Sequence, residues 1–180
     1  AQIAQWLAQG AMVGIICNTV ADAQRLFHQF SMLDIKQPID LFHARFTFSD
    51  RTRLEKQALK NYGKHAQRTG RLLIATQVVE QSLDLDFDVL ISQIAPIEFL
   101  MQRMGRLWRH DRIDSDLCPR AASIKAPLFI TLLPQEEITE QTTKQQLKGH
   151  YQGSGYVYQN TRLLYRTEEY LQQNTHLSFP

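Results

Sequence analysis

The sequence has no long apolar run, few cysteines and almost no net charge. No apolar stretch reaches the roughly 18 residues that a membrane-spanning helix needs, and no signal peptide is recognisable. The two cysteines, Cys17 and Cys118, lack metal-ligand spacing and fit a reducing compartment, so we expect a cytoplasmic protein without a membrane partner. Because 20 basic residues stand against 18 acidic ones, any contact with nucleic acid must come from a local patch.

Short apolar runs alternate with helical patterns along residues 1–134. The runs predict strands at 12–17, 39–42, 71–75, 89–92 and 126–132. Helices are expected at 1–9, after a cap at Thr19, between a cap at Ser49 or Asp50 and Gly63, and from Pro96 onward. This alternation predicts an α/β fold, an open and mostly parallel sheet with helices on both faces. Ligands of such folds bind at the carboxyl ends of the strands.

The composition divides the chain into two parts. Residues 1–134 carry the α/β pattern, whereas residues 135–155 are polar and predict a loop. Residues 156–174 predict a helix, so we expect 135–180 to form a polar loop and a C-terminal helical extension. The sequence opens at Ala1 inside a helical pattern, from which we expect a longer protein.

The segment from Gln102 to His110 is the most informative stretch. On a helix, Gln102, Arg106 and Arg109 share one stripe, and the opposite stripe is apolar, formed by Leu100, Met104 and Leu107. Two guanidiniums at a fixed spacing suit the charge of a transferring phosphoryl group, and Gly105 suits a close approach to the backbone. Arg103 points about 100° away and is expected to be a structural ion-pair partner. The alternative for the whole segment is a solvated basic helix face.

Two blocks of the sequence resemble motifs of superfamily 2 helicases. Ala75-Thr76 followed by Ser82-Leu83-Asp84 is similar to motif V, and Gln102-Arg103, Gly105-Arg106 and Arg109 are similar to motif VI. The residues within these two motifs resemble those of the CRISPR-associated helicase–nuclease of type I systems more than those of the DEAD-box branch. Residues 17–23 resemble motif IV of that family, and 43–46 with 50–51 resemble its next block. The resemblance covers residues 10–112 and implies the second, C-terminal RecA-like lobe.

The resemblance implies that this lobe supplies part of an ATP site. In the family the later arginine, here Arg109, acts as a finger on the γ-phosphate, and the earlier one, Arg106, supports it. Asp84 matches the motif V carboxylate that contacts the ribose or nearby polar groups of the nucleotide. Gln102, which can donate and accept hydrogen bonds, and Gly105 complete the expected nucleotide-binding residues.

The resemblance also implies a track for single-stranded DNA at the strand ends. Polar and basic groups that can follow a phosphate backbone are expected there: Thr76, Arg45, His43, Asn18 and Thr19. For Thr19 and Thr76 the alternative is helix capping. Arg51 could line the same track, and its alternative is an ion pair with Glu55, four residues further on.

Half of a helicase active site is missing from the sequence. It contains no Gly-x-x-x-x-Gly-Lys-Ser/Thr loop and no Asp-Glu-x-His motif, so the resemblance assigns the phosphate loop and the Mg²⁺ ligands to a first RecA-like lobe. The chain alone is therefore expected not to hydrolyse ATP. Asp84, Asp86 and Asp88 imitate a calcium loop, but Val89 stands where that loop needs glycine, and His110-Asp111 is too small a set for a metal nuclease. We expect no metal site.

These observations predict one lobe of an ATP-dependent DNA helicase that translocates on and unwinds DNA in CRISPR interference. Its expected partners are single-stranded DNA, the first lobe and nuclease domain of the same protein, and a CRISPR surveillance complex. The alternatives are a lobe of an RNA or DNA-repair helicase, or a non-catalytic α/β interaction domain. The motif positions that would contact the nucleotide carry the expected residues, Arg106, Arg109 and Asp84, which argues against the non-catalytic alternative.

Overall fold

A single parallel sheet organises the chain. The computed structural model describes residues 2–80, 83–112, 117–135 and 143–174. Five strands pair in the order β2-β3-β1-β4-β5, each parallel to its neighbour. Their bounds are β1 Met12–Ile16, β2 Ile39–Phe42, β3 Arg71–Ala75, β4 Val89–Gln93 and β5 Leu128–Leu132. The open, parallel α/β fold predicted from the alternation is confirmed, and the predicted strand bounds differ by at most two residues.

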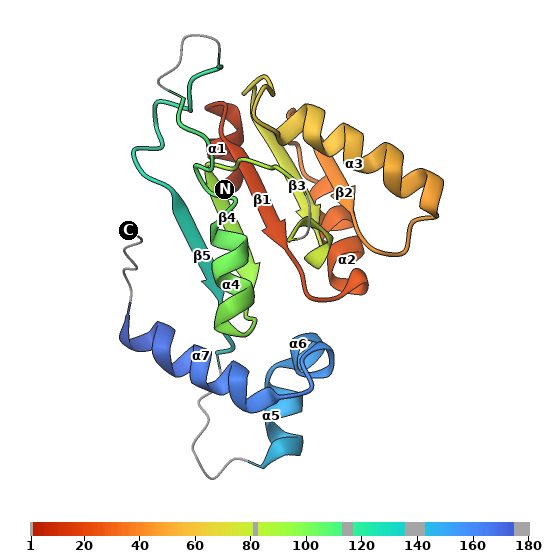
Figure 1. Cartoon of the computed structure of the whole chain (residues 1–180), viewed down its shortest axis with the longest axis vertical. Helices are drawn as coiled ribbons and strands as arrows, with labels where there is room; N and C mark the ends of the chain where they lie inside the picture. Colours follow the sequence, from red (N-terminus) through yellow and green to blue (C-terminus); the bar gives the residue numbers. More distant parts are fainter. Residues whose placement is uncertain (1, 81–82, 113–116, 136–142, 175–180) are drawn as a thin grey trace.

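Helices cover both faces of the sheet, because each strand alternates apolar side chains toward two cores. One core packs strand residues such as Val13, Ile15 and Ile74 against α1 (Gln2–Ala8) and α2 (Val20–Ser31). The other core packs Ile16, Leu73 and Leu90 against α3 (Phe48–Tyr62). α4 (Ile97–Met104) lies in front of β4 in the view of Figure 1.

The predicted helix caps are partly right. Thr19 caps α2, and its hydroxyl accepts a hydrogen bond from the backbone N–H of Asp22 at 3.0 Å. α3 begins earlier than expected, since Thr47 is its cap in place of Ser49 or Asp50. Gly63 ends α3, as predicted.

The prediction of a loop over 135–155 is wrong for residues 144–155. α5 (Lys144–His150) and α6 (Gln152–Val157) occupy this stretch, and α7 (Thr161–Gln173) follows where one longer helix was expected from 156. Residues 136–142 and 175–180 lie outside the described part. The three helices sit below the carboxyl ends of the strands (Figure 1), and Leu147, Tyr151 and Leu164 pack on Ile94. No helix in the described ranges is long and apolar enough to cross a membrane.

The prediction that one helix carries both Arg106 and Arg109 is also wrong. α4 ends at Met104, and the chain beyond it runs beside Phe87. The Phe87 N–H donates to the Arg106 carbonyl at 2.8 Å, and the Trp108 N–H donates to the Phe87 carbonyl at 3.1 Å. Trp108 has a φ of 43°, a left-handed conformation that no α-helix contains. This long-range pairing replaces the last helical turns.

We predict that Gly70→Ala destabilises the chain strongly, by about 3 kcal/mol or more. Gly70 precedes β3 with a φ of +81°, and an added Cβ would lie 1.9 Å from the Leu7 carbonyl oxygen of α1. Gly149→Ala is the matched control, because no described atom lies within 4 Å of its added Cβ. Its stability should stay within about 1 kcal/mol of the parent. Denaturant unfolding of both variants checks this, and equal losses would contradict the close approach.

Candidate functional site

Three of the residues predicted to bind nucleotide lie near the C-terminal end of α4. Arg109 Nε donates to Asp84 Oδ1 at 2.5 Å, and the Arg109 side chain also donates to the Gly105 carbonyl at 3.2 Å. Arg106 donates from Nε to the Val79 carbonyl at 3.3 Å and from Nη2 to the Glu80 carbonyl at 2.9 Å. Arg109 and Asp84 therefore form an ion pair although 25 residues separate them, and Arg106 lies close enough for the charges of both to act on it.

The electrostatics of this group favour the ionised form of Asp84. Burial alone would raise the pKa of Asp84, but the hydrogen bond from Arg109 and the charges of His110 and Arg109 outweigh it, so the pKa lies below its usual value. Burial and the nearby charge of Arg109 lower the pKa of Arg106 from a value far above neutrality. Arg109 is 40% exposed in its side chain, and Asp84 is 48% exposed. Their ion pair therefore faces solvent and can exchange partners.

Gln102 and Gly105 flank these arginines. Gln102 lies exposed on the last turn of α4, and Gly105 is the exposed residue that ends the helix. Gly105 has an ordinary φ of −61°, and an added Cβ would meet only the Gln102 and Met101 carbonyls, at 3.4 and 3.7 Å. The lobe itself therefore does not require glycine at this position.

The predicted nucleic-acid residues lie at the carboxyl ends of three neighbouring strands. Asn18 and Thr19 follow β1, His43 and Arg45 follow β2, and Thr76 follows β3. Backbone pairing holds these ends together, since the Thr76 N–H donates to the Phe42 carbonyl at 3.1 Å. Gln77 links the next pair of ends through its side-chain N–H, which donates to the Asn18 carbonyl at 2.9 Å.

Exposure differs sharply within this strand-end group. Arg45 is exposed, whereas His43 is 4% exposed and stacks on Phe46 with ring centroids 4.2 Å apart. Burial lowers the pKa of His43, which favours the neutral ring. Thr76 is 2% exposed, and its hydroxyl has no hydrogen-bond partner among the described residues. Thr76 caps no helix through its side chain, so the capping alternative fails there and holds for Thr19.

Asn18 is buried and does not lie on the exposed surface that a DNA track would need. It is 3% exposed, and its side-chain amide donates to the Ile94 carbonyl at 2.6 Å and to Ser154 Oγ at 2.7 Å. Its side-chain carbonyl accepts from Arg103 Nη2 at 3.0 Å. Asn18 thus organises the strand ends from inside the fold.

Arg103 is the buried centre of the surrounding polar network, which confirms its prediction as an ion-pair residue. Its side chain is fully buried and pairs with Glu80 at 2.7 Å. It also donates to Ser92 Oγ at 2.7 Å, to the Gln93 carbonyl at 3.1 Å and to Tyr158 at 3.0 Å. Sequence reasoning singled out neither Glu80 nor Tyr158, although Glu80 lies inside the motif V run. Gln81 and Ser82 of that run lie outside the described residues.

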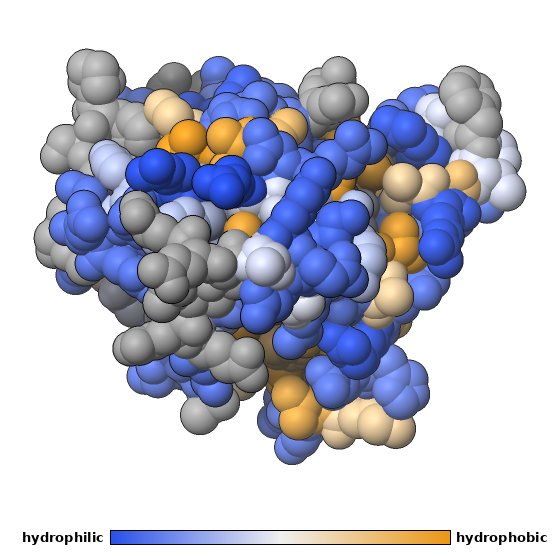
Figure 2. Space-filling view, turned by 90° about the horizontal axis from the view of Figure 1, so that it is seen from below, coloured by the Kyte–Doolittle hydropathy of each residue, from blue (hydrophilic) through white to orange (hydrophobic). Residues whose placement is uncertain are grey.

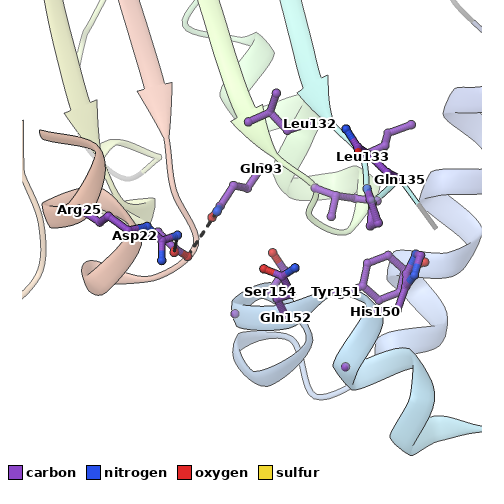
Figure 3. A pocket seen from close by; sticks show the side chains of 14 residues that line it. Asp22, Arg25, Gln93, Leu132, Leu133, Gln135, His150, Tyr151, Gln152 and Ser154 are labelled. Carbon is purple, nitrogen blue, oxygen red and sulfur yellow. Dashed lines mark hydrogen bonds and ion pairs between the residues drawn. The ribbon is translucent and has the colours of Figure 1, made fainter. Parts of the chain in front are cut away.

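A polar cleft of about 490 Å³ adjoins the strand-end group. It opens between the ends of β4 and β5, the first turn of α2 and the α5–α6 turn (Figure 3). Gln93 donates to Asp22 at 3.3 Å across one wall, and Ser154 lines another. Figure 2 views this end of the molecule from below and shows hydrophilic residues over most of it.

The acidic run that imitates a calcium loop has arginine partners. Asp86 and Asp88 are fully buried, and both pair with Arg120, at 3.0 and 3.2 Å. Arg68 pairs with Asp88 at 2.6 Å, and Arg112 pairs with Asp86 at 2.9 Å. Within the described ranges no cluster of three or more His, Cys, Asp or Glu side chains has the geometry of a metal site.

Known proteins resemble the chain in both sequence and structure. Residues 9–112 match the family model described as CRISPR-associated nuclease/helicase Cas3, C-terminal. The CRISPR-associated endonuclease/helicase Cas3 of Escherichia coli K12 is 42% identical over 166 residues, which are 91% of this chain and 17% of that protein. The crystal structure of T. fusca Cas3-ATP superposes with a TM-score of 0.81 at 33% identity, over 96% of this chain and 19% of that one.

A third resemblance is to a chain in a solved structure of a CRISPR RNA-guided surveillance complex in its pre-nicking state. The TM-score is 0.61 at 28% identity, over 89% of this chain and 24% of that one. The chain therefore spans about a fifth of the length of these relatives.

We predict that Glu80→Ala destabilises the chain by about 3–5 kcal/mol, because it leaves the Arg103 guanidinium buried without its counter-charge. Glu98→Ala, an exposed change on the first turn of α4, is the control and should cost about 0.5 kcal/mol. Thermal and denaturant unfolding measure both. A loss for Glu80→Ala no larger than the control's would contradict the central role of this ion pair.

Proposed function

Since the chain belongs to the family of CRISPR-associated nuclease/helicase Cas3 C-terminal domains, we propose that it is the second RecA-like lobe of an ATP-dependent DNA helicase. In this proposal ATP binds between this lobe and a first RecA-like lobe. The single observation that carries the proposal is the meeting of Arg106, Arg109 and Asp84 at one exposed edge. The T. fusca relative has a crystal structure named as its ATP form, which supports nucleotide as the ligand.

Arg109 is the catalytic arginine of the proposal. Its side chain is 40% exposed, and among the described residues its guanidinium contacts a solvent-facing carboxylate and one backbone carbonyl. Such a pair contributes little to folding, about 0–1 kcal/mol, so the guanidinium can leave Asp84 at small cost. A γ-phosphoryl group gains negative charge on its outer oxygens during transfer, and a guanidinium aimed there stabilises the transition state.

Arg106 supports the finger from a more fixed position. Its two hydrogen bonds to the Val79 and Glu80 carbonyls hold the guanidinium against the segment that follows β3. Asp84 offers a carboxylate for the sugar of the nucleotide. Gln102 and Gly105 lie at the end of α4, where Arg109 donates to the Gly105 carbonyl. The guanidinium N–H groups can donate to phosphate oxygens, and the carboxylate can accept from ribose hydroxyls.

Single-stranded DNA is the proposed nucleic acid, and the strand-end group is its proposed track. Arg45 is the exposed cation of that group and Thr19 is half-buried, whereas Thr76 is buried and its hydroxyl has no hydrogen-bond partner among the described residues. Asn18 and His43 then support the track from below. Closing and reopening of the two lobes would move this track along the strand.

The first lobe supplies what this sequence lacks. In the proposal it carries the phosphate loop and the Mg²⁺ ligands, and the same protein carries a nuclease domain. A CRISPR surveillance complex is the proposed partner assembly in the cytoplasm, because one similar chain belongs to a structure of such a complex. The chain alone is expected not to hydrolyse ATP.

We predict that Arg109→Ala, in the protein that contains both lobes, lowers ATP turnover on the order of 1,000-fold and leaves ATP affinity nearly unchanged. The reason is that the charge on the γ-phosphoryl oxygens appears mainly in the transition state. Arg109→Lys should rescue poorly, since an ammonium cannot reproduce the planar fork. Steady-state hydrolysis, nucleotide binding and thermal stability are measured on the same samples.

Arg53→Ala is the matched control for that experiment. Arg53 is a solvent-exposed arginine on α3, away from the proposed site, and its pair with Asp50 is 3.3 Å long. Its replacement should leave turnover and stability unchanged. Near-normal turnover in Arg109→Ala would refute the finger assignment, and a collapse in stability with normal turnover per folded molecule would assign Arg109 a structural role.

We predict that Arg45→Ala weakens binding of single-stranded DNA and makes it less dependent on salt, because one phosphate contact is lost. The slope of log affinity against log salt should become shallower by about 0.7. Arg53→Ala serves as the control, since Arg53 is a solvent-exposed arginine on α3 that is not one of the proposed track residues. Titrations with DNA and RNA of the same sequence test the nucleic-acid class. Equal slopes for Arg45→Ala and the parent would remove Arg45 from the track.

A further inference from the structure

Tyr158 connects the C-terminal helices to the polar network of the helicase motifs. It ends α6, far beyond motif VI in the sequence, and lies outside every motif considered above. Its hydroxyl donates to the Asn18 side-chain carbonyl at 3.2 Å and accepts from Arg103 Nη2 at 3.0 Å. One hydroxyl therefore touches residues of motif IV and motif VI together.

The same network grips the short 3₁₀ helix η1 (Gln77–Val79) and the residue after it. Gln77 donates to the Asn18 carbonyl at 2.9 Å, and the Glu80 carboxylate accepts from Arg103 at 2.7 Å. Arg106 donates hydrogen bonds to the backbone carbonyls of Val79 and Glu80. Segment 77–80 is thus fixed between Arg103 and Arg106.

This segment lies between the two edges of the lobe that the proposed function uses. It begins directly after Thr76 of the strand-end group, and its last carbonyls orient Arg106 of the arginine group. A shift of segment 77–80 would therefore move the proposed DNA track and the proposed nucleotide site together. Contiguous hydrogen-bonded elements of this kind can carry coupling between sites.

We propose that Tyr158 is a positioning residue, whose hydroxyl fixes Arg103 and thereby segment 77–80, so that α6 adjusts the coupling between the DNA edge and the nucleotide edge. The inference rests on the proposed function. Tyr158 touches neither nucleotide nor DNA in this arrangement. It acts through Arg103 and Asn18, which are both buried.

The ring and the hydroxyl of Tyr158 have separable tasks. The ring packs on Phe99 of α4 with centroids 5.6 Å apart and belongs to the cluster around Ile94 and Tyr151. Tyr158→Phe keeps this packing and removes only the hydroxyl. Arg103 retains Glu80, Ser92 and the Gln93 carbonyl, so the guanidinium stays paired while one restraint on its position is lost.

Tyr156→Phe is the matched control, because Tyr156 lies on the same helix and is 70% exposed. The first measurement is hydrogen exchange of the backbone amides of residues 77–80 in the whole 180-residue chain. The Glu80 N–H bonds the Gln77 carbonyl at 2.9 Å and reports on the segment directly. Tyr158→Phe should raise its exchange about 10-fold, with the strands of the sheet unchanged. Tyr156→Phe should change neither.

The second measurement is ATP hydrolysis by the two-lobe protein with and without single-stranded DNA. Tyr158→Phe should lower the DNA-stimulated kcat about 3- to 10-fold and leave the KM for ATP within about twofold. Tyr156→Phe should behave like the parent. A purely structural role would lower the active fraction at every DNA concentration by the same factor.

The outcomes separate this inference from the proposed function. Identical behaviour of the two phenylalanine variants in both measurements would overturn the positioning role. Faster exchange throughout the sheet, with the same fractional loss of basal and stimulated turnover, would also overturn it. If the two-lobe parent hydrolyses no ATP while Tyr158→Phe still raises exchange locally at 77–80, the proposed function is refuted. The positioning of the segment by Tyr158 is then still supported.

Discussion

The burial of the Arg103 guanidinium is the constraint on which the site depends. Removing a guanidinium from water costs several kcal/mol, and this is offset only if its donors are satisfied with good geometry. Arg103 is fully buried, and its partners come from four parts of the chain. They lie on β4, after β3, after β1 and at the end of α6: Ser92, Glu80, Asn18 and Tyr158. Elements that are distant in sequence must therefore meet around one side chain. A displaced element would leave a charge or a carbonyl without its partner.

The elements that the sequence predicted well are those specified by local patterns. Strand 71–75 is a short apolar run, and the Thr19 cap needs only the three residues after it. The helix through Arg109 was wrong because its end is set by Phe87, which lies some twenty residues earlier and pairs with the chain after Gly105. The polar stretch before 155 contains a local helix signal that its composition masks. Thr143 and Gln146 form a reciprocal capping box at the start of α5.

The candidate site was predicted at the level of residue types but not of contacts. Thr76, Arg45 and Asn18 were expected at strand ends and lie there, because parallel strands bring their carboxyl ends to one edge. The burial of Asn18 could not be read from the sequence, since its partner Ser154 on α6 lies in the stretch 135–155 that was predicted to be a loop. Tyr158 and Ser154 gave no signal, because their partner Asn18 is more than 130 residues away.

The roles proposed for Arg106 and Arg109 rest on a difference in restraint among three arginines of one segment. Arg103 is fully buried among five partners, Arg106 is half-buried against two backbone carbonyls, and Arg109 is held mainly by an exposed carboxylate. A catalytic guanidinium must be placed accurately, yet must also transfer its hydrogen bonds to a phosphoryl group that arrives from another domain. The proposed roles match this difference in restraint. Arg103 fixes segment 77–80 and that segment orients Arg106. Arg109 could exchange its solvent-exposed carboxylate partner for a phosphoryl group at small cost.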